Sequence, residues 1–200
     1  MTTFNVKGFW PFFTNANLLR FDYSYTDSDA RLCTSVFSYN TGSQSMLYNN
    51  YDASGNWLNK WWYNYVPGFG MAEYRDDYPG GKKVVLSPAI GWGDYFSIGD
   101  VYFNQPKFDF LKCWPPATGS GVQIVKFEEM LPSMVVKGQT YQNVLVLSYM
   151  QAWGGKAGTG ARYYLAENVG PISVEFITQN APGSTQVTTA PRMDAVVTHV

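Results

Sequence analysis

Two pairs of adjacent acidic residues are the first candidates for chemistry in this sequence. They are Asp76-Asp77 and Glu128-Glu129. A glycoside hydrolase needs two carboxyl groups that face each other across roughly 5 to 9.5 Å. Neighbouring residues on a strand point to opposite faces, so neither pair meets this requirement alone. The position of Asp76-Asp77 just before Pro79-Gly80-Gly81 is typical of a turn. Two distant acids that converge in the fold stay open as a hydrolase centre.

Histidine and cysteine offer no recognisable centre. His199 is the only histidine and lies next to the last residue. A Ser-His-Asp centre, a Cys-His centre or a histidine metal site needs a firmly held imidazole, which this position rarely provides. Cys33 and Cys113 are far apart, so they are either buried free thiols or one long-range disulfide. We therefore predict no catalytic residue, no metal, no cofactor and a protein that is not an enzyme.

Aromatic residues are the strongest compositional signal, with 7 Trp, 15 Tyr and 13 Phe. Trp61 and Trp62 must face opposite sides of any strand they share, so one can belong to the core while the other is exposed or lies at an interface. Flat indole rings also stack on sugars. The candidate contact residues, chosen mainly for their loop-like surroundings rich in Gly and Pro, are Trp92, Trp114, Trp153 and, from the adjacent pair, Trp62. Ordinary core packing is the alternative for each of them.

The overall composition limits the possible partners. The chain has 200 residues, a formal charge of −1 and only 14% charged residues. Such a charge-poor surface argues against nucleic acid and against an anionic membrane surface. The sequence near Met1 lacks the pattern of a signal peptide, and no apolar run is long enough to span a membrane. We expect synthesis in the cytoplasm, with incorporation into a virion as one route out of the cell.

Short alternating segments bounded by Gly and Pro predict an all-β, antiparallel sandwich or barrel of about ten to twelve strands with long loops. The clearest candidates are Thr34–Asn40, Trp57–Val66 and Tyr141–Tyr149. Within the last segment, four consecutive apolar residues indicate burial on both faces. Residues 104–121 and 150–161 are rich in Pro or Gly and are expected to be long loops.

The C-terminal segment is expected to differ from the rest of the chain. Residues 1–179 are predicted to form one β domain, and residues 180–200 an extended arm or tail. Its apolar end could add a strand to the sheet of a neighbouring subunit. The residues expected to make that contact are Met193, Val196, Val197 and Val200. A disordered tail and a last strand within the same domain are the alternatives.

Two parts of the chain resemble small bacterial surface β-proteins of the lipoprotein-like kind. The first comprises Gly8–Phe13, Asn17 and Phe21–Tyr25, an aromatic-Pro step followed by alternating aromatics. The second comprises Val136–Leu147 and Arg162–Phe176. The resemblance implies a β-sheet fold without a catalytic centre, and it assigns no site residues. This chain lacks the signal peptide and lipidation cysteine of those proteins. A phage or virus structural protein could use the same fold.

The function that these observations favour is a non-enzymatic structural or adhesion module, a phage tail or capsid component that docks other protein copies as a homo-oligomer. The low charge, the aromatic surplus and the apolar end of the chain all indicate surfaces covered by partners. A glycan-binding module that uses exposed tryptophans is the alternative. A glycoside hydrolase is a third hypothesis, because converging acids remain open.

Overall fold

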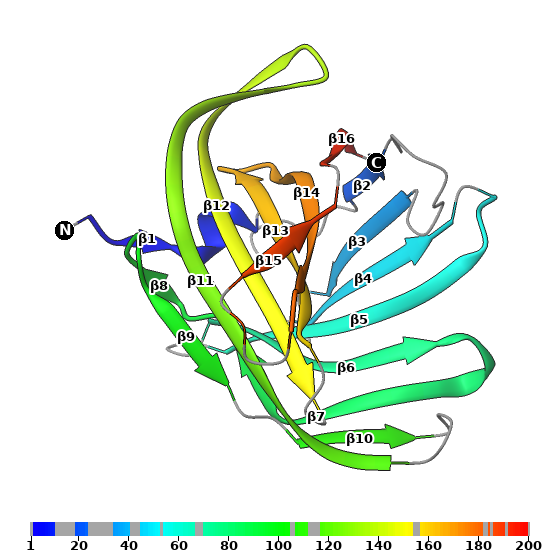
Figure 1. Cartoon of the computed structure of the whole chain (residues 1–200). Helices are drawn as coiled ribbons and strands as arrows, with labels where there is room; N and C mark the ends of the chain where they lie inside the picture. The colour runs from blue at the N-terminus through cyan, green and yellow to red at the C-terminus, as the bar shows by residue number, and fades with distance from the viewer. Residues whose placement is uncertain are drawn as a thin grey trace.

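The computed structural model describes residues 2–10, 19–23, 34–40, 45–52, 54–66, 70–104, 107–111, 117–153, 157–181, 184, 186–190 and 192–199. These residues form sixteen strands and two short 3₁₀-helices (Figure 1). The first half contains β1 (Phe4–Asn5), η1 (Val6–Phe9), β2 (Leu19–Tyr23), β3 (Thr34–Asn40), β4 (Ser45–Tyr51), β5 (Trp57–Val66), β6 (Gly70–Tyr78), η3 (Pro79–Gly81), β7 (Lys82–Gly91) and β8 (Tyr95–Phe96). The second half contains β9 (Val101–Asn104), β10 (Lys107–Leu111), β11 (Ala117–Val136), β12 (Gln139–Trp153), β13 (Thr159–Ala166), β14 (Gly170–Gln179), β15 (Val187–Thr189) and β16 (Met193–His199).

The strands form two antiparallel layers. Strands β2 to β7 and β10 make up what we call the N-terminal sheet, and β9 and β11 to β15 the C-terminal sheet. The predicted all-β antiparallel architecture is confirmed, and the sheets do not close into a barrel. The small β1–β8 sheet is separate, with Phe4 opposite Phe96.

Two strands pass from one layer to the other. The first residues of β11 pair with β10, and the rest of β11 pairs with β12 and β9. At the other corner, Met193 and Asp194 of β16 pair with β14, while Ala195 to His199 pair with β2. Corner strands of this kind join packed sheets in β-sandwiches.

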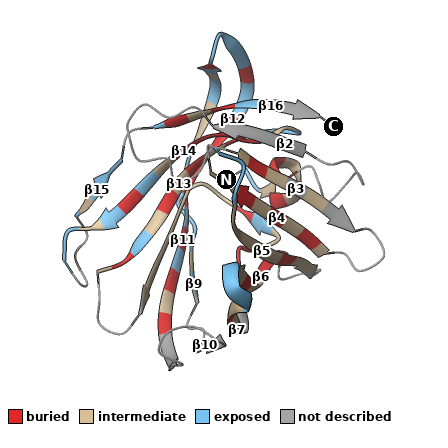
Figure 2. Ribbon diagram, turned by 90° about the vertical axis from the view of Figure 1, so that its right-hand side faces the viewer, coloured by how far each residue is buried: buried red, intermediate tan, exposed pale blue. Residues whose placement is uncertain are grey.

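Strands β11 and β12 form a long curved hairpin that rises above the rest of the molecule (Figures 1 and 2). Its turn uses Lys137 and Gly138, with φ values of 48° and 82°. Two successive residues with positive φ are typical of a tight hairpin turn. Near the tip, Val136 and Tyr141 pack in a small second cluster with Val144 and Ile172. Val144, Leu145, Val146 and Leu147 are all buried, which confirms the predicted burial on both faces.

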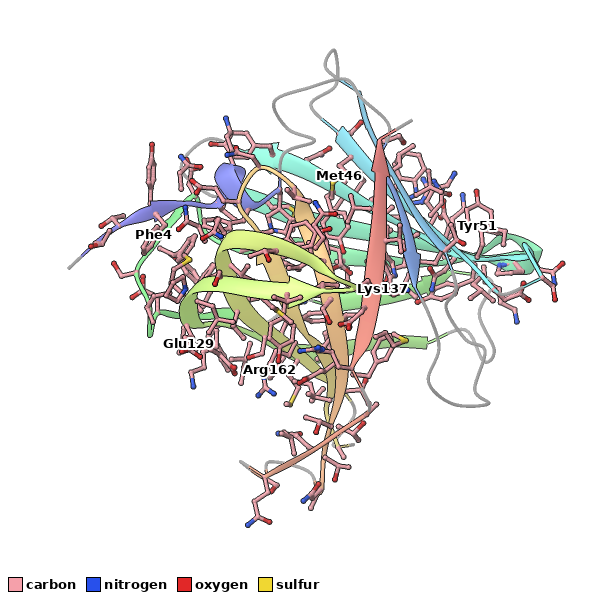
Figure 3. All side chains as sticks on the ribbon, turned by 90° about the horizontal axis from the view of Figure 1, so that it is seen from above. Phe4, Met46, Tyr51, Glu129, Lys137 and Arg162 are labelled. Atoms are coloured by element: carbon pink, nitrogen blue, oxygen red, sulfur yellow. The ribbon has the colours of Figure 1, made fainter. Side chains whose placement is uncertain are left out.

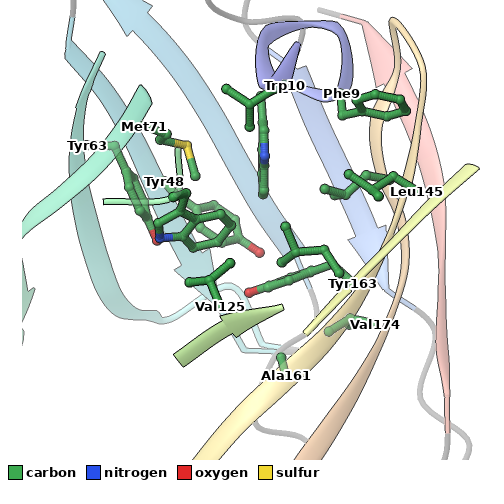
Figure 4. Packing of buried hydrophobic residues seen from close by; sticks show 14 of the residues in the cluster. Phe9, Trp10, Tyr48, Tyr63, Met71, Val125, Leu145, Ala161, Tyr163 and Val174 are labelled. Atoms are coloured by element: carbon green, nitrogen blue, oxygen red, sulfur yellow. The ribbon is translucent and has the colours of Figure 1, made fainter. Parts of the chain in front are cut away.

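The main core lies between the two sheets and is rich in aromatic rings (Figure 4). Phe96 stacks on Phe127 with ring centroids 4.0 Å apart and an interplanar angle of 7°. Trp61 packs against this core, and Trp62 lies on the opposite face of β5, as the sequence predicted. Aromatic pairs of these geometries stabilise a core beyond the area that they bury.

Three segments differ from the sequence expectations. Residues 104–121 contain β10 and the start of β11, and residues 150–161 contain the end of β12 and the start of β13, so neither is one long loop. Asp76 and Asp77 lie within β6, and the turn follows at Pro79–Gly81. The strands exceed the expected number because segments not expected to form strands of the domain, such as β1, β10, β15 and β16, are paired in the fold.

The C-terminal segment is also placed differently from the expected arm. Residues 193–199 form a strand of the chain's own sheet, which was the alternative left open. Met193 is buried, Val196 is exposed and Val197 packs against the core. Val200, like Cys33, Cys113 and Trp114, lies outside the described residues. The described residues include no helix long and apolar enough to cross a membrane.

Candidate functional site

Two acidic side chains of β6 point into the space between the sheets. Glu73 is 5% exposed and Asp76 is 8% exposed. Residues three apart on a regular strand face opposite sides. Here the pairing with β5 shifts, so that Glu73 lies opposite Tyr63 and Asp76 lies opposite Trp61. The extra residue, Tyr74, forms a β-bulge that turns both carboxyl groups inward.

The two carboxyl groups form a hydrogen-bonded pair. Glu73 is hydrogen bonded to Asp76, and it accepts a hydrogen bond from the Tyr63 hydroxyl. Burial raises the pKa of Glu73 to about 7, because water no longer solvates the charged form. Burial raises the pKa of Asp76 well above its usual range, and the neighbouring charge of Glu73 raises it further. The pair therefore retains a proton near neutral pH.

Aromatic rings surround this acid pair. Tyr149 and Tyr163 stack with centroids 5.8 Å apart and are hydrogen bonded to each other. Trp92 lies 6.2 Å from the Tyr63 ring and 5.9 Å from the Tyr149 ring. Tyr63 and Tyr163 project into the same interior space from opposite sheets (Figure 4). Burial, followed by the charge of Glu73, raises the pKa of both Tyr63 and Tyr149.

Several buried polar atoms in this region have no hydrogen-bond partner among the described residues. They are Oδ1 of Asp76, Nε1 of Trp92 and both amide atoms of Gln123. Gln123 is fully buried on β11, two residues before Val125, which lies opposite Tyr149. Buried polar atoms are nearly always satisfied in native proteins, so each unsatisfied one needs a specific explanation.

The geometry of the pair does not match a glycoside hydrolase. Two hydrogen-bonded carboxyl groups are closer together than the roughly 5 Å or more that such an enzyme requires. Across the described residues, no group of three or more His, Cys, Asp or Glu side chains could hold a metal ion. What the arrangement can do is hold a proton, accept hydrogen bonds and attract a positive charge.

A second pair of acids converges on the outer face of the C-terminal sheet. Arg162 Nε lies 2.9 Å from a Glu128 oxygen, and its Nη1 lies 3.1 Å from a Glu175 oxygen. Ser148 also donates to Glu128. Figure 3 shows both Arg162 and Glu129 on the outer side of this sheet. Because one guanidinium is ion-paired with both carboxylates, this pair suits structural stabilisation rather than proton transfer.

Beside this network lies a set of outward-facing apolar residues that we call the apolar row. Phe103 on β9 pairs with Ile124 on β11, which pairs with Met150 on β12. Val101, the next outward-facing residue of β9, extends the apolar row along this strand and pairs with Lys126 of β11. Phe103 is 58% exposed and Val101 is 56% exposed. Exposed contiguous apolar groups on a soluble surface usually mark a contact site.

The tryptophans chosen from the sequence are not brought together. Trp92 is only 1% exposed, so the expectation that it forms an exposed contact is wrong. Trp62 faces outward and is half-buried, with its Nε1 donating to Asp77 at 2.9 Å and Arg75 stacked 4.9 Å from its ring. Trp153 ends β12, but its side chain, like all of Trp114, lies outside the described part.

Sequence reasoning missed Glu73 and mistook the setting of Asp76. One signal was available for Glu73, because it follows the apolar pair Met71-Ala72 in a strand-like segment. A charged residue at an inward position usually has a partner or a function. The β-bulge that brings Asp76 to the same face leaves no comparable pattern in a single sequence.

Comparison with known protein families, with curated proteins and with solved structures finds no match to this chain. The resemblance to small bacterial surface β-proteins therefore stays a prediction.

Proposed function

We propose that this chain is a non-enzymatic structural module that docks a second copy of itself along strand β9. The observation that carries the proposal is the exposure of Phe103 and Val101 on a strand at the edge of its sheet. Among the described residues, β9 pairs with β11 only. Its other edge therefore offers backbone N–H and C=O groups to a further strand.

The sequence of β9 lacks the usual protection of an edge strand. Proteins commonly block such edges with lysine, proline or inward-pointing charges. Strand β9 is Val-Tyr-Phe-Asn and contains none of these. Tyr102 points inward and its hydroxyl donates to the Tyr95 carbonyl, which ties β9 to the neighbouring segment. The strand is thus held in place while its outer face and free edge stay available.

A twofold arrangement satisfies this edge. If β9 pairs antiparallel with β9 of a second copy, the two apolar rows become one continuous row across both subunits. The charged residues Lys126 and Arg162 would then lie along its side. An apolar centre with a charged border is the common composition of protein interfaces.

The setting that we propose for this docking is a virion, in which the chain is a tail or capsid component. The support is compositional: 14% charged residues and 18% aromatic residues suit a surface that is largely covered in an assembly. The docking proposal itself does not depend on this setting.

Light scattering coupled to size-exclusion chromatography tests the proposal. We expect the wild-type chain to associate as concentration rises and the variant Phe103→Lys to stay monomeric, since a lysine on the edge opposes strand pairing. Val135→Lys is the matched control, because Val135 is 61% exposed but lies in the hairpin near the tip. A wild-type chain that is monomeric at every concentration, or equal association by both variants, would overturn the proposal.

Trp62 supports a second candidate function, glycan binding. Its ring lies beside Tyr74 at 6.4 Å, and the adjacent Arg75 and Asp77 form a bidentate ion pair. Aromatic faces next to paired charged groups suit sugar hydroxyls and the flat faces of sugar rings. A glycan array compares the wild type with Trp62→Ala. Equal signals from the two proteins, or no bound sugar, would eliminate this candidate.

A further inference from the structure

The interior acid pair has no basic partner among its described neighbours. The groups that act on Glu73 and Asp76 are each other, Tyr63 and Asp77, and none of them is positively charged. Buried acidic groups in proteins are normally paired with a cation or with several hydrogen-bond donors. Around this pair, the residues that the structure describes thus concentrate negative charge without a compensating side chain.

The rings around the pair have the composition of a cation-binding cage. The Trp92 ring contacts those of Tyr63 and Tyr149, and Tyr163 stacks on Tyr149. The face of an aromatic ring attracts a cation electrostatically, most strongly for Trp. The four rings come from different strands or connecting segments and lie beside two carboxyl groups. A cation among them would be attracted both by the ring faces and by the negative charge of the acid pair.

Unsatisfied polar atoms provide an independent indication of a ligand. Asp76 Oδ1, a hydrogen-bond acceptor on a buried residue of the cluster, has no partner among the described residues. The Gln123 amide lies on the facing strand, one inward position from Val125. An acceptor such as Asp76 Oδ1 suits an ammonium donor, while the Gln123 carbonyl can take a second N–H.

We propose that Glu73 and Asp76 bind a small organic ammonium ion between the two sheets, with Tyr63, Trp92, Tyr149 and Tyr163 as the aromatic cage. An anion would be repelled by the carboxyl groups. A neutral sugar would leave their charge uncompensated, and the described residues supply too few ligands for a metal ion. An ammonium ion supplies the charge, and the rings cover its carbon atoms.

The cluster approaches solvent at one side. Trp61, which lies opposite Asp76, and Tyr149 are both half-buried. The residues at the next inward position on this side are polar. Here the Ser35 hydroxyl donates a hydrogen bond to Asn50 Oδ1 at 2.8 Å. These residues mark the side from which a ligand would enter.

Binding of a cation should release a proton. Below its raised pKa the pair holds a proton, and a bound cation favours the ionised pair, so the proton leaves to solvent. Tyr63 and Tyr149, from the other strands around the pair, stay neutral at this pH because burial raises the pKa of both hydroxyls above the usual tyrosine value near 10. Asp77 stays charged because Arg75 and Trp62 hold its pKa low against burial.

Isothermal titration and thermal unfolding with methylammonium chloride test the proposal, with sodium chloride at equal concentration as the reference. We expect methylammonium alone to raise the unfolding temperature. At neutral pH the heat should depend on the ionisation enthalpy of the buffer, which reports proton release. Glu73→Gln should weaken binding about tenfold or more, equivalent to about 1.4 kcal/mol. Glu129→Gln is the matched control, since it makes the same change at an exposed residue of β11, and it should leave binding unchanged.

Two results would overturn the proposal. One is an equal response of the wild-type chain to both salts, a comparison that requires no variant to fold. The other is equal binding by Glu73→Gln and the wild type. Both are independent of β9, so neither bears on self-association.

Discussion

Glu73 lies in an environment that disfavours the charged form of its side chain. It is buried among aromatic rings, it is hydrogen bonded to a second acid, and its pKa is raised to about 7. The β-bulge at Tyr74, which is fixed by the pairing of β6 with β5, holds Glu73 in this unfavourable environment. Environments of this kind are commonly functional, since they place a proton or a charge where a ligand can use it.

The raised pKa of Glu73 makes the stability of the folded chain depend on pH. Because the folded-state pKa of Glu73 lies above its ordinary value of 4.5, the folded state binds more protons than the unfolded state between these values. The free energy of unfolding should therefore be highest at acidic pH and fall as pH rises toward and past 7. At about 1.4 kcal/mol per pKa unit, the loss is about 3 kcal/mol. Chemical denaturation across this range measures it.

The variant Glu73→Gln provides the comparison. It removes the titrating group, so the decrease in stability with rising pH should become shallower. Asp77→Asn should keep the wild-type slope in this range, because the pKa of Asp77 is lowered and its titration lies at more acidic pH. A wild-type profile that rises from acidic to neutral pH would contradict the assigned environment of the acid pair.

Trp92 shows why single residues were hard to place from sequence. Its neighbours Gly91 and Gly93 suggested an exposed loop. In the structure, Gly93 has a φ of 77°, and a Cβ there would lie 2.5 Å from the Tyr102 ring. The glycine therefore permits a left-handed backbone and close packing, with Trp92 buried next to it. A glycine in sequence does not distinguish a loop from such a close approach.

At the scale of elements, alternation and turn chemistry predicted most strands. Thr34–Asn40 and Trp57–Val66 match β3 and β5, and the Asp52 turn is held by hydrogen bonds from Ser54 and Asn56 to its side chain. Strand β10 was not predicted because its pairing with β7 and β11 depends on residues far away in sequence. Long-range pairing of this kind overrides local propensity.

The close approach of β12 and β13 yields a prediction about Gly160. A Cβ at this position would lie 1.9 Å from the backbone oxygen of Tyr149, which cannot move without disturbing the sheet. Gly160→Ala should destabilise the chain by about 1 to 3 kcal/mol in denaturant unfolding. Gly8→Ala is the control, because nothing lies within 4 Å of its added methyl group. Equal stabilities of the two variants would show that the strands are not so closely packed.

At the scale of the whole molecule, the two layers depend on their corner strands. The sequence indicated a separate C-terminal arm because the segment before Met193 is rich in Thr and Pro. Instead β16 completes the fold: Ala195 is buried, and Ser173 donates to both the Met193 carbonyl and the Asp194 carboxylate. Local composition could not reveal this, since the partners of β16 are β14 and the N-terminal strand β2.

Truncation tests the role of β16. A chain that ends before Met193 loses the strand that joins the two sheets at one corner. We expect it to lose the near-ultraviolet circular dichroism of its packed aromatic side chains and its cooperative thermal transition. A truncated chain with an unchanged spectrum and a sharp transition would show that the segment is dispensable, as expected of a free arm.

We propose that a second copy of the chain meets this molecule at the edge formed by β9. Hydrogen–deuterium exchange of the β9 backbone, measured at low and high protein concentration, tests it most directly. We predict that the peptide containing Val101–Asn104 becomes protected as concentration rises, while the hairpin tip around Lys137 exchanges equally at both concentrations. Exchange in β9 that does not change with concentration, in a sample that light scattering shows to have associated, would contradict the claim.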